Sequence, residues 1–206
     1  RAARKEICEL IRRAYDQKLF TSTQGTFSMR LSDGSFIITP FGKDRKYLSA
    51  EDLVHIQDGR KEAGKIPSRS VLLHQNIYEK HAHIHSVIIA HPPSTMAFAV
   101  TEEEFDSRTI PESYILLRNV QKIPFGLTFM QPAMVADLFV LSNPIVLAEN
   151  DSVIVTGNSL LNAFDRLEVL EYSAKALISS KILGPVVKID DEKIRDIEEA
   201  FQLPKT

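Results

Sequence analysis

The segment that most constrains the fold is a short, uniformly apolar run near the middle of the chain. Residues 86–90 read SVIIA, and His91 followed by two prolines ends the run. So short an apolar run between structure-breaking residues predicts a strand buried in a sheet. A buried strand needs other strands beside it and helices packed on its sheet, so we expect both kinds of element elsewhere in the chain.

Alternation of apolar and polar residues predicts the neighbouring strands. Residues 26–31 alternate with period two, and the turn sequence Ser32-Asp33-Gly34 joins them to a second strand at 35–39, which gives a hairpin. Further strands are predicted at 54–56, 145–148, 153–156 and 186–189.

Apolar stripes with helical spacing predict the covering helices. One stripe lies in residues 7–15, and a longer one runs over 160–178 before Gly184 ends the helix. Shorter helices are predicted after residues 67–70, at 95–100, at 132–142 and from the capping positions 190–191 to 201, with capping-box patterns at 49–52 and 101–104. The stretch 110–124 gives no clear pattern.

Composition agrees with an α/β protein that buries one core. The chain has 206 residues, of which 44% are hydrophobic and 25% charged, as in ordinary globular proteins. No repeat, low-complexity stretch or linker divides it, so we predict a single domain over residues 1–206. Hairpins and helices occur in the same chain, which favours a sheet with helices packed on its faces.

Charge and cysteine content exclude several classes of protein. A net charge of -2 gives no bulk attraction to nucleic acid or to an anionic membrane. The single cysteine, Cys8, excludes an internal disulfide and a zinc site built from cysteines. No apolar run approaches the roughly 20 residues of a membrane span, and the N-terminus shows no signal sequence. We therefore expect a cytoplasmic protein.

Histidine is the one reactive residue type that is concentrated in the sequence. His81, His83 and His85 have period two, so on a strand they would share a face and could bind zinc or copper. The alternative is a polar loop with solvated imidazoles, which this weak spacing favours. His91 ends the buried strand, where open sheets often bind ligands. A histidine that only hydrogen-bonds the strand end is the simpler interpretation.

A second group of polar residues lies at a predicted helix start. Ser68, Arg69 and Ser70 could hold a phosphate there, because the free N–H groups and the helix dipole favour anions. Helix capping explains the serines equally well. Tyr114 and Asp151 are possible acid or base groups, as is Glu112.

Seven segments match one family pattern in order and spacing. In the first half of the chain, QGTFSMR at 24–30 matches G-N-x-S-x-R, ITPFG at 38–42 matches I-T-P-[ST]-G, and Leu53-Val54 follows at the expected distance. PSRS at 67–70, with His74 and Ile77-Tyr78, matches P-S-S-E…H…I-Y, and VIIAHP at 87–92 matches V-V-H-T-H-P. In the second half, VLAENDS at 146–152 matches V-L-L-x-N-H-G, and Gly157 with AFDRLEVLE at 163–171 matches G…A…x-E-x-L-E. Taken together the chain resembles the class II aldolase/adducin family, from the first helix to about Lys181.

The resemblance implies a three-layer α/β/α fold, with a central, mostly antiparallel sheet and helices on both faces. It also implies a homo-oligomer, often a C4 tetramer. Active members bind zinc or a related divalent metal with three histidines, and a glutamate serves as ligand or base. The metal stabilises negative charge on the oxygens of a sugar phosphate during cleavage of a carbon–carbon bond.

The family's metal positions are mostly changed in this sequence. The glutamate falls on Ser70, the first histidine on Ile89 and the last on Asp151, and only His91 is kept. By resemblance, His91 and Asp151 are the remaining metal candidates, and Ser70 is a candidate catalytic position. Tyr114 lies where some aldolases carry a mobile catalytic tyrosine.

The family's phosphate positions are changed as well. Its asparagine falls on Thr26, its second serine on Arg69, and the residue before Gly42 is Phe41, while Gly42 and Ser68 persist. We predict a phosphate or anion site at Thr26, Gly42, Ser68 and Arg69. Phe41 is expected to obstruct a polar pocket, and an inward-turned Arg69 would restore affinity for an anion.

These observations lead to two functional hypotheses. In the first, an aldolase-like protein has lost most zinc ligands, needs no cofactor, and is non-catalytic or adapted to bind a small anion or a protein partner. In the second, it is a divergent aldehyde-lyase or epimerase acting on a sugar phosphate. Its zinc or other divalent metal would use His91, Asp151 and a group from a neighbouring subunit or from the histidines at 81–85. An unrelated α/β protein is the remaining alternative.

Overall fold

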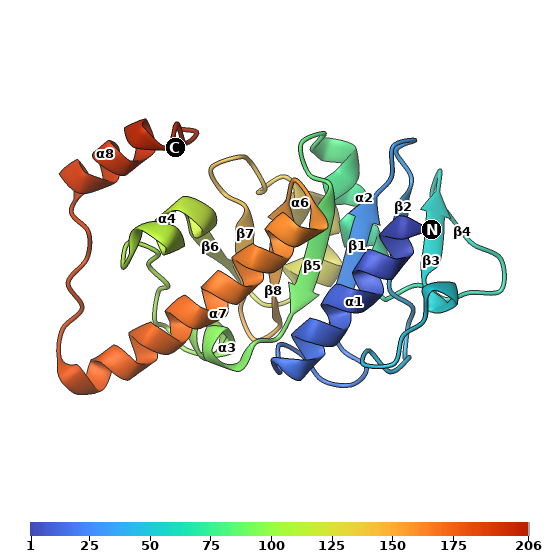
Figure 1. The fold of residues 1–206 in the computed structure, drawn as a ribbon, viewed down its shortest axis with the longest axis horizontal. Coiled ribbons are helices and arrows are strands. Elements are labelled where there is room, and N and C mark those ends of the chain that lie inside the picture. The colour runs from blue at the N-terminus through green and yellow to red at the C-terminus, as the bar shows by residue number, and fades with distance from the viewer. Residues whose placement is uncertain (206) are drawn as a thin grey trace.

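The computed structural model describes residues 1–205, and its centre is one eight-stranded sheet, which Figure 1 shows between the helices. All neighbouring strands are antiparallel except the last pair, which is parallel. The strand order across the sheet is β4 (Arg60–Lys61), β3 (Val54–Gln57), β2 (Phe36–Ile38), β1 (Thr26–Arg30), β5 (Ser86–Ala90), β8 (Ser152–Gly157), β7 (Ile145–Ala148) and β6 (Val120–Ile123). The predicted mostly antiparallel sheet is confirmed.

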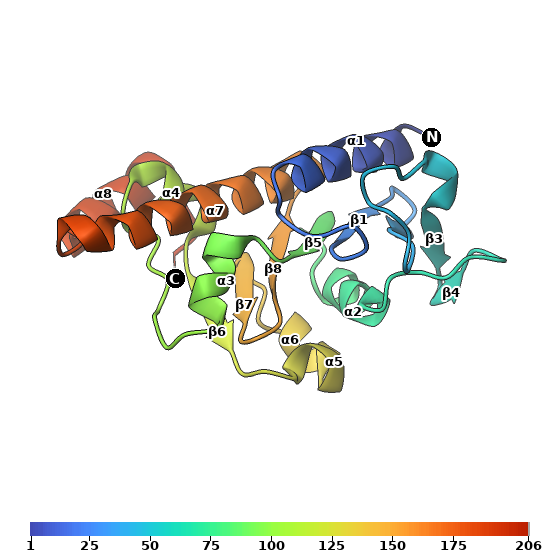
Figure 2. The same ribbon diagram turned by 90° about the horizontal axis from the view of Figure 1, so that it is seen from below.

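Helices cover both faces of this sheet, as the sequence predicted (Figure 2). On one face lie α1 (Ala2–Asp16), α3 (Pro93–Ala99), α4 (Pro111–Leu117) and α7 (Leu160–Leu183). On the other lie α2 (Val71–Lys80), α5 (Leu127–Met130) and α6 (Pro132–Ala136). Outside these layers are a 3-10 turn at Ala50–Asp52 and α8 (Asp191–Ala200).

β5 shows why the apolar run has no polar side. Its successive side chains point to opposite faces of the sheet, so Ile88 packs in the core under α1 and α7 while Ile89 packs in the core under α2. All five residues of the strand are buried. The strand that predicted a layered fold is therefore covered on both faces.

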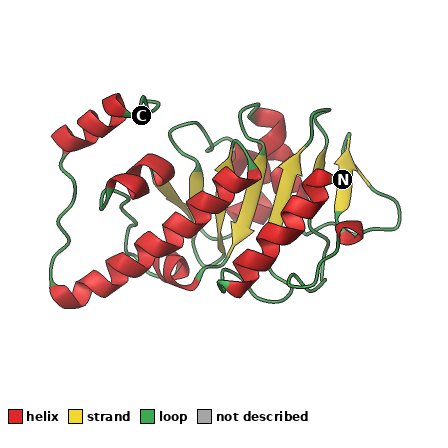
Figure 3. Cartoon of the chain, viewed as in Figure 1, coloured by secondary structure: helices red, strands yellow, loops and turns green. Residues whose placement is uncertain are grey.

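Several predicted elements differ from those in the structure. Residues 186–189 form no strand, because α7 carries them beyond the sheet and leaves Val187 89% exposed (Figure 3). The capping-box pattern at 101–104 starts no helix. The helix predicted over 132–142 ends at Ala136, where the chain turns back into a bridge between Val140 and Asn143. The unassigned stretch 110–124 holds α4 and β6.

The long helix α7 is fixed at its start by contact with the end of β8. Ser159 accepts a hydrogen bond from the main-chain N–H of Asn162, which caps the helix. Gly157 lies so close to the first turn of the helix that a Cβ there would be 2.5 Å from the main-chain N of Ala163. Within residues 1–205 neither this helix nor any other has the length and apolar character to span a bilayer.

We predict that Gly157→Ala lowers the free energy of unfolding by about 2–3 kcal/mol, because the new methyl group meets main-chain atoms that cannot move aside. Urea unfolding measures the loss. Gly64→Ala is the matched control, since a Cβ there meets no atom within 4 Å and adds only the backbone cost of φ +77°. A loss no larger than that of the control would contradict the close contact of β8 and α7.

Candidate functional site

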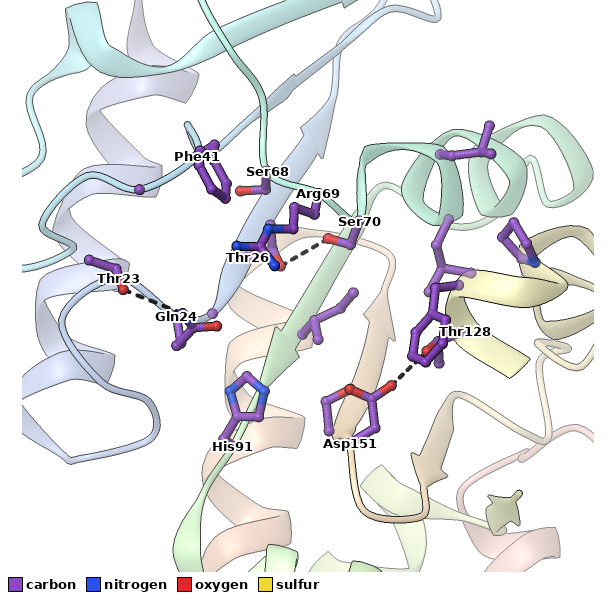
Figure 4. Close-up of a pocket in the computed structure, with 18 of the residues that line it drawn as sticks. Thr23, Gln24, Thr26, Phe41, Ser68, Arg69, Ser70, His91, Thr128 and Asp151 are labelled. Atoms are coloured by element: carbon purple, nitrogen blue, oxygen red, sulfur yellow. Dashed lines mark hydrogen bonds between the residues drawn. The ribbon is translucent and has the colours of Figure 1, made fainter. Parts of the chain in front are cut away.

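A cavity of about 590 Å³ opens where β5 ends beside the start of β1 (Figure 4). Its walls come from the loops before β1 and after β2, the start of α2, the end of β5, the α5 region and the turn before β8. The cavity brings together nearly all residues that the sequence predicted for the site: Thr26, Gly42, Ser68, Arg69, Ser70, His91 and Asp151.

Tyr114 does not line this cavity, and neither does its neighbour Glu112. Tyr114 is buried in α4, which packs against α7, and the guanidinium carbon of Arg118 lies 5.4 Å from its ring centre. A catalytic role for Tyr114 stays a prediction.

One wall of the cavity rests on a row of polar contacts between β1 and α2. Thr26 Oγ1 lies 3.1 Å from Ser70 Oγ, and Ser28 Oγ lies 2.6 Å from His74 Nδ1 and 2.5 Å from the Tyr78 hydroxyl. Two residues advance about 6.6 Å along a strand and four residues advance about 6 Å along a helix. The spacing from Thr26 to Ser28 therefore matches the spacing from Ser70 to His74. These contacts set the position of Ser70 at the cavity wall.

His74 is the fully buried member of this row. Burial lowers its pKa to about 3, so the imidazole is neutral at ordinary pH. Burial likewise raises the pKa of the Tyr78 hydroxyl well above its usual value. The row is therefore held by neutral hydrogen bonds and carries no charge toward the cavity.

His91 and Asp151 enter the cavity from neighbouring strand ends (Figure 4). The main-chain N–H of His91 donates to Leu19 O at 2.9 Å, and its Nδ1 is buried with no hydrogen-bond partner in the described part of the chain. Burial lowers the pKa of His91, and the nearby charge of Asp151 opposes that shift. Asp151 accepts a hydrogen bond of 2.6 Å from Thr128 Oγ1, which fixes its carboxylate.

The end of β5 is held in place by a buried carboxylate. Glu171 of α7 accepts hydrogen bonds from the main-chain N–H groups of Ser94 and Thr95 and from the Thr95 hydroxyl, at 2.8–3.1 Å. These contacts cap α3, which begins directly after His91 and Pro92. Sequence reasoning placed Glu171 in a helix stripe but did not predict this capping role.

The residues present do not fit the family's zinc ion. Ile89 has no donor atom, and the neutral hydroxyl of Ser70 is already hydrogen-bonded to Thr26. His91 and Asp151 remain, whereas catalytic zinc takes three protein ligands. Across residues 1–205, no three His, Cys, Asp or Glu side chains are grouped so that they could hold a metal.

The histidines at 81–85 do not supply the missing ligands. They lie in the loop after α2, outside the cavity, so the interpretation as a polar loop is correct and the shared strand face is wrong. His81 Nε2 contacts Ala136 O at 2.6 Å, and the His81 and His83 rings meet edge to face with their centres 5.6 Å apart.

The opposite end of the cavity is cationic. The guanidinium of Arg69 lies over the ring of Phe41, 4.8 Å from its centre, and reaches toward Thr26 (Figure 4). Phe41 is 44% exposed, lines the cavity and is a stacking surface for the arginine, which was not predicted; that it obstructs a polar ligand stays a prediction. Ser68 is buried and donates to Thr39 O at 2.8 Å, which makes it a support for the loop.

Sequence reasoning missed Arg45, a second arginine in the cavity wall. It is 3% exposed and donates to the main-chain oxygens of Gly25, Pro40 and Lys43 at 2.9–3.0 Å. Burial lowers its pKa to about 10, so it stays charged at neutral pH. In the sequence it lies in the charged run GKDRK, which has the pattern of a solvated loop, so no local signal indicates its burial.

Comparison with known proteins decides the family. Residues 5–178 match the family model described as the Class II Aldolase and Adducin N-terminal domain. The chain belongs to this family. The resemblance inferred from the seven motifs is thereby confirmed.

Named relatives and solved structures extend this result. The chain is 27% identical to the 3-oxo-tetronate 4-phosphate decarboxylase of Haemophilus influenzae, over 95% of this chain and 96% of that protein. It is 25% identical to the L-fuculose phosphate aldolase of Methanocaldococcus jannaschii, over 84% and 93% of the two chains. YgbL of Escherichia coli superposes with a TM-score of 0.83 at 26% identity, covering 95% and 97%. An L-fuculose 1-phosphate aldolase structure gives 0.84 at 22%, covering 98% and 97%, and shows the fold.

We predict that His74 makes the stability fall in mild acid. Its pKa of about 3 in the folded state lies below the unfolded value near 6.5, so between these pH values the unfolded chain binds more protons. The contribution is fully present above pH 6.5 and declines at up to about 1.4 kcal/mol per pH unit below it. Urea unfolding at pH 7.5, 6 and 5 measures the slope.

His74→Gln is expected to remove this part of the slope while keeping a hydrogen-bonding side chain beside Ser28. His85→Gln, at an exposed position, is the matched control and should leave the slope unchanged. A slope that is equal in all three proteins would show that His74 is not the buried neutral group described above.

Proposed function

We propose that this protein binds a small phosphorylated sugar derivative in the cavity beside β5, and that it does so without the zinc centre of the family's aldolases. One observation carries the proposal. The cavity keeps a cationic end, with Arg69 and Arg45 in its wall, while the opposite end keeps only His91 and Asp151 of the metal positions.

The cationic end suits a phosphate ester. Guanidinium groups form paired hydrogen bonds with phosphate oxygens, and Arg69 has no carboxylate partner among residues 1–205 that would compete for it. The two relatives named above act, by their names, on a tetronate phosphate and on fuculose phosphate. Both names describe a phosphate ester on a short oxygenated carbon chain, which supports the same ligand class for this chain.

A divergent metal-dependent lyase or epimerase is the second candidate. The observation in its favour is that His91 and Asp151 line the same cavity, where the charge of Asp151 acts on His91 and opposes the lowering of its pKa by burial. A metal there would need a third donor from outside the described chain, such as a neighbouring subunit. The tetramer, the cytoplasmic location, the single domain over 1–206 and a role in binding a protein partner stay predictions.

We predict that L-fuculose 1-phosphate binds to the purified protein and that EDTA leaves its affinity unchanged. Unphosphorylated L-fuculose should bind at least about tenfold more weakly, because it offers no charged acceptor to the arginines. Isothermal titration calorimetry measures both. Arg69→Gln should weaken binding of the phosphate by about tenfold, and Arg60→Gln, an exposed position on β4, is the matched control.

The two candidates differ in their dependence on metal. If chelation abolishes binding and about one zinc per chain restores it, the metal-dependent lyase is the better account. If neither the phosphate nor the free sugar binds, with or without zinc, the assignment of the cavity to a sugar phosphate is wrong.

A further inference from the structure

Arg45 is a buried cation without an acidic partner. Its side chain is 3% exposed, and none of the ion pairs in residues 1–205 includes it. Charged groups are rarely buried unless they are paired, because leaving water costs far more free energy than a few contacts return. The missing counter-charge is the feature that needs an explanation.

Main-chain carbonyls satisfy part of the guanidinium. Nε donates to Gly25 O, and Nη1 donates to Pro40 O and Lys43 O. These carbonyls belong to the two loops that flank the cationic end of the cavity, so the side chain crosslinks the loops. Nη2 has no acceptor among residues 1–205, and Arg45 lines the cavity.

We propose that Nη2 of Arg45 binds the ligand's phosphate directly, and that Arg45 and Arg69 together select a doubly charged phosphate monoester. The proposal rests on the proposed function, since it specifies the charge and chemical class of that ligand. It assigns a role in specificity to a residue that none of the family motifs contains.

Two guanidinium groups at one end of a cavity favour a dianion over a single negative charge. A phosphate monoester takes up its second charge with a pKa near 6, whereas a diester or a carboxylate carries only one. Burial lowers the pKa of Arg45 to about 10, which is still above the working range. Arg45 therefore keeps its charge between pH 5 and 8. His91, the histidine that lines the cavity, has its pKa lowered by burial, and the monoester takes up its second charge in this range, so its affinity should rise with pH.

The test uses methyl phosphate and dimethyl phosphate as probes, with the intact protein at pH 8. The wild type should bind methyl phosphate about tenfold or more tightly than dimethyl phosphate, and Arg45→Gln should lose most of that preference. If Arg45→Gln only loosened the loops, the affinities for the two probes would fall by the same factor. The ratio of the two affinities, measured by calorimetry or competition, therefore separates direct contact from a structural effect.

Arg166→Gln is the matched control. Arg166 is partly buried, donates to the main-chain oxygens of Leu116 and Thr156, and has its pKa lowered to about 10 by burial, but it does not line the cavity. It should show a comparable loss of melting temperature and an unchanged ratio of affinities.

The outcomes separate the two proposals. If the wild type binds neither phosphate, the proposed function fails and this inference fails with it. If it binds methyl phosphate and Arg45→Gln keeps the full preference, only the role of Arg45 is overturned. If Arg45→Gln does not fold, Arg45→Lys replaces it in the same comparison of the two probes. The pH profile of the wild type is the second measurement: equal affinity for the monoester at pH 5 and pH 7.5 would overturn the selection of a dianion.

Discussion

Burial of β5 on both faces is the constraint on which the rest of the structure depends. Helices must cover each side of this strand, and the strand must end where the covering layers leave space for a cavity. Glu171 fixes that end by capping α3, so His91 leaves the strand in a defined direction. Where α2 packs against β1, the matched spacing of the strand and the helix fixes the positions of Thr26 and Ser70. The walls of the site thus follow from packing.

The chain keeps the family fold, whereas the positions that its motifs match to the family's metal ligands carry other side chains at Ser70, Ile89 and Asp151. Ile89 shows this best: it is almost fully buried in the core under α2, so an aliphatic side chain there suits the packing and removes a metal donor at once. At the cationic end the change is in the opposite direction, because Arg69 stacks on Phe41 and adds charge. Fold alone does not decide the activity.

The sequence predicted those features that depend on short-range patterns. Period-two strands, the stripe of α7 and the polar residues at strand and helix ends were all visible, and so were most residues that line the cavity. Arg45 was not visible, because its burial depends on carbonyls from two distant loops. The strand predicted at 186–189 failed for a related reason, since an apolar segment becomes a strand only where a partner edge is available. The contact between Phe41 and Arg69 was not visible either, because it joins two loops that lie far apart in the sequence.

The central claim is that the cavity binds a phosphate ester at its arginines without zinc beside His91. A crystal structure of the protein grown with both zinc and L-fuculose 1-phosphate, with anomalous data at the zinc edge, tests it most directly. We predict density for a phosphate in contact with Arg45 and Arg69, and no anomalous peak beside His91. A zinc peak at about 2.0–2.2 Å from His91 and Asp151, with the sugar oxygens on the metal, would contradict the account.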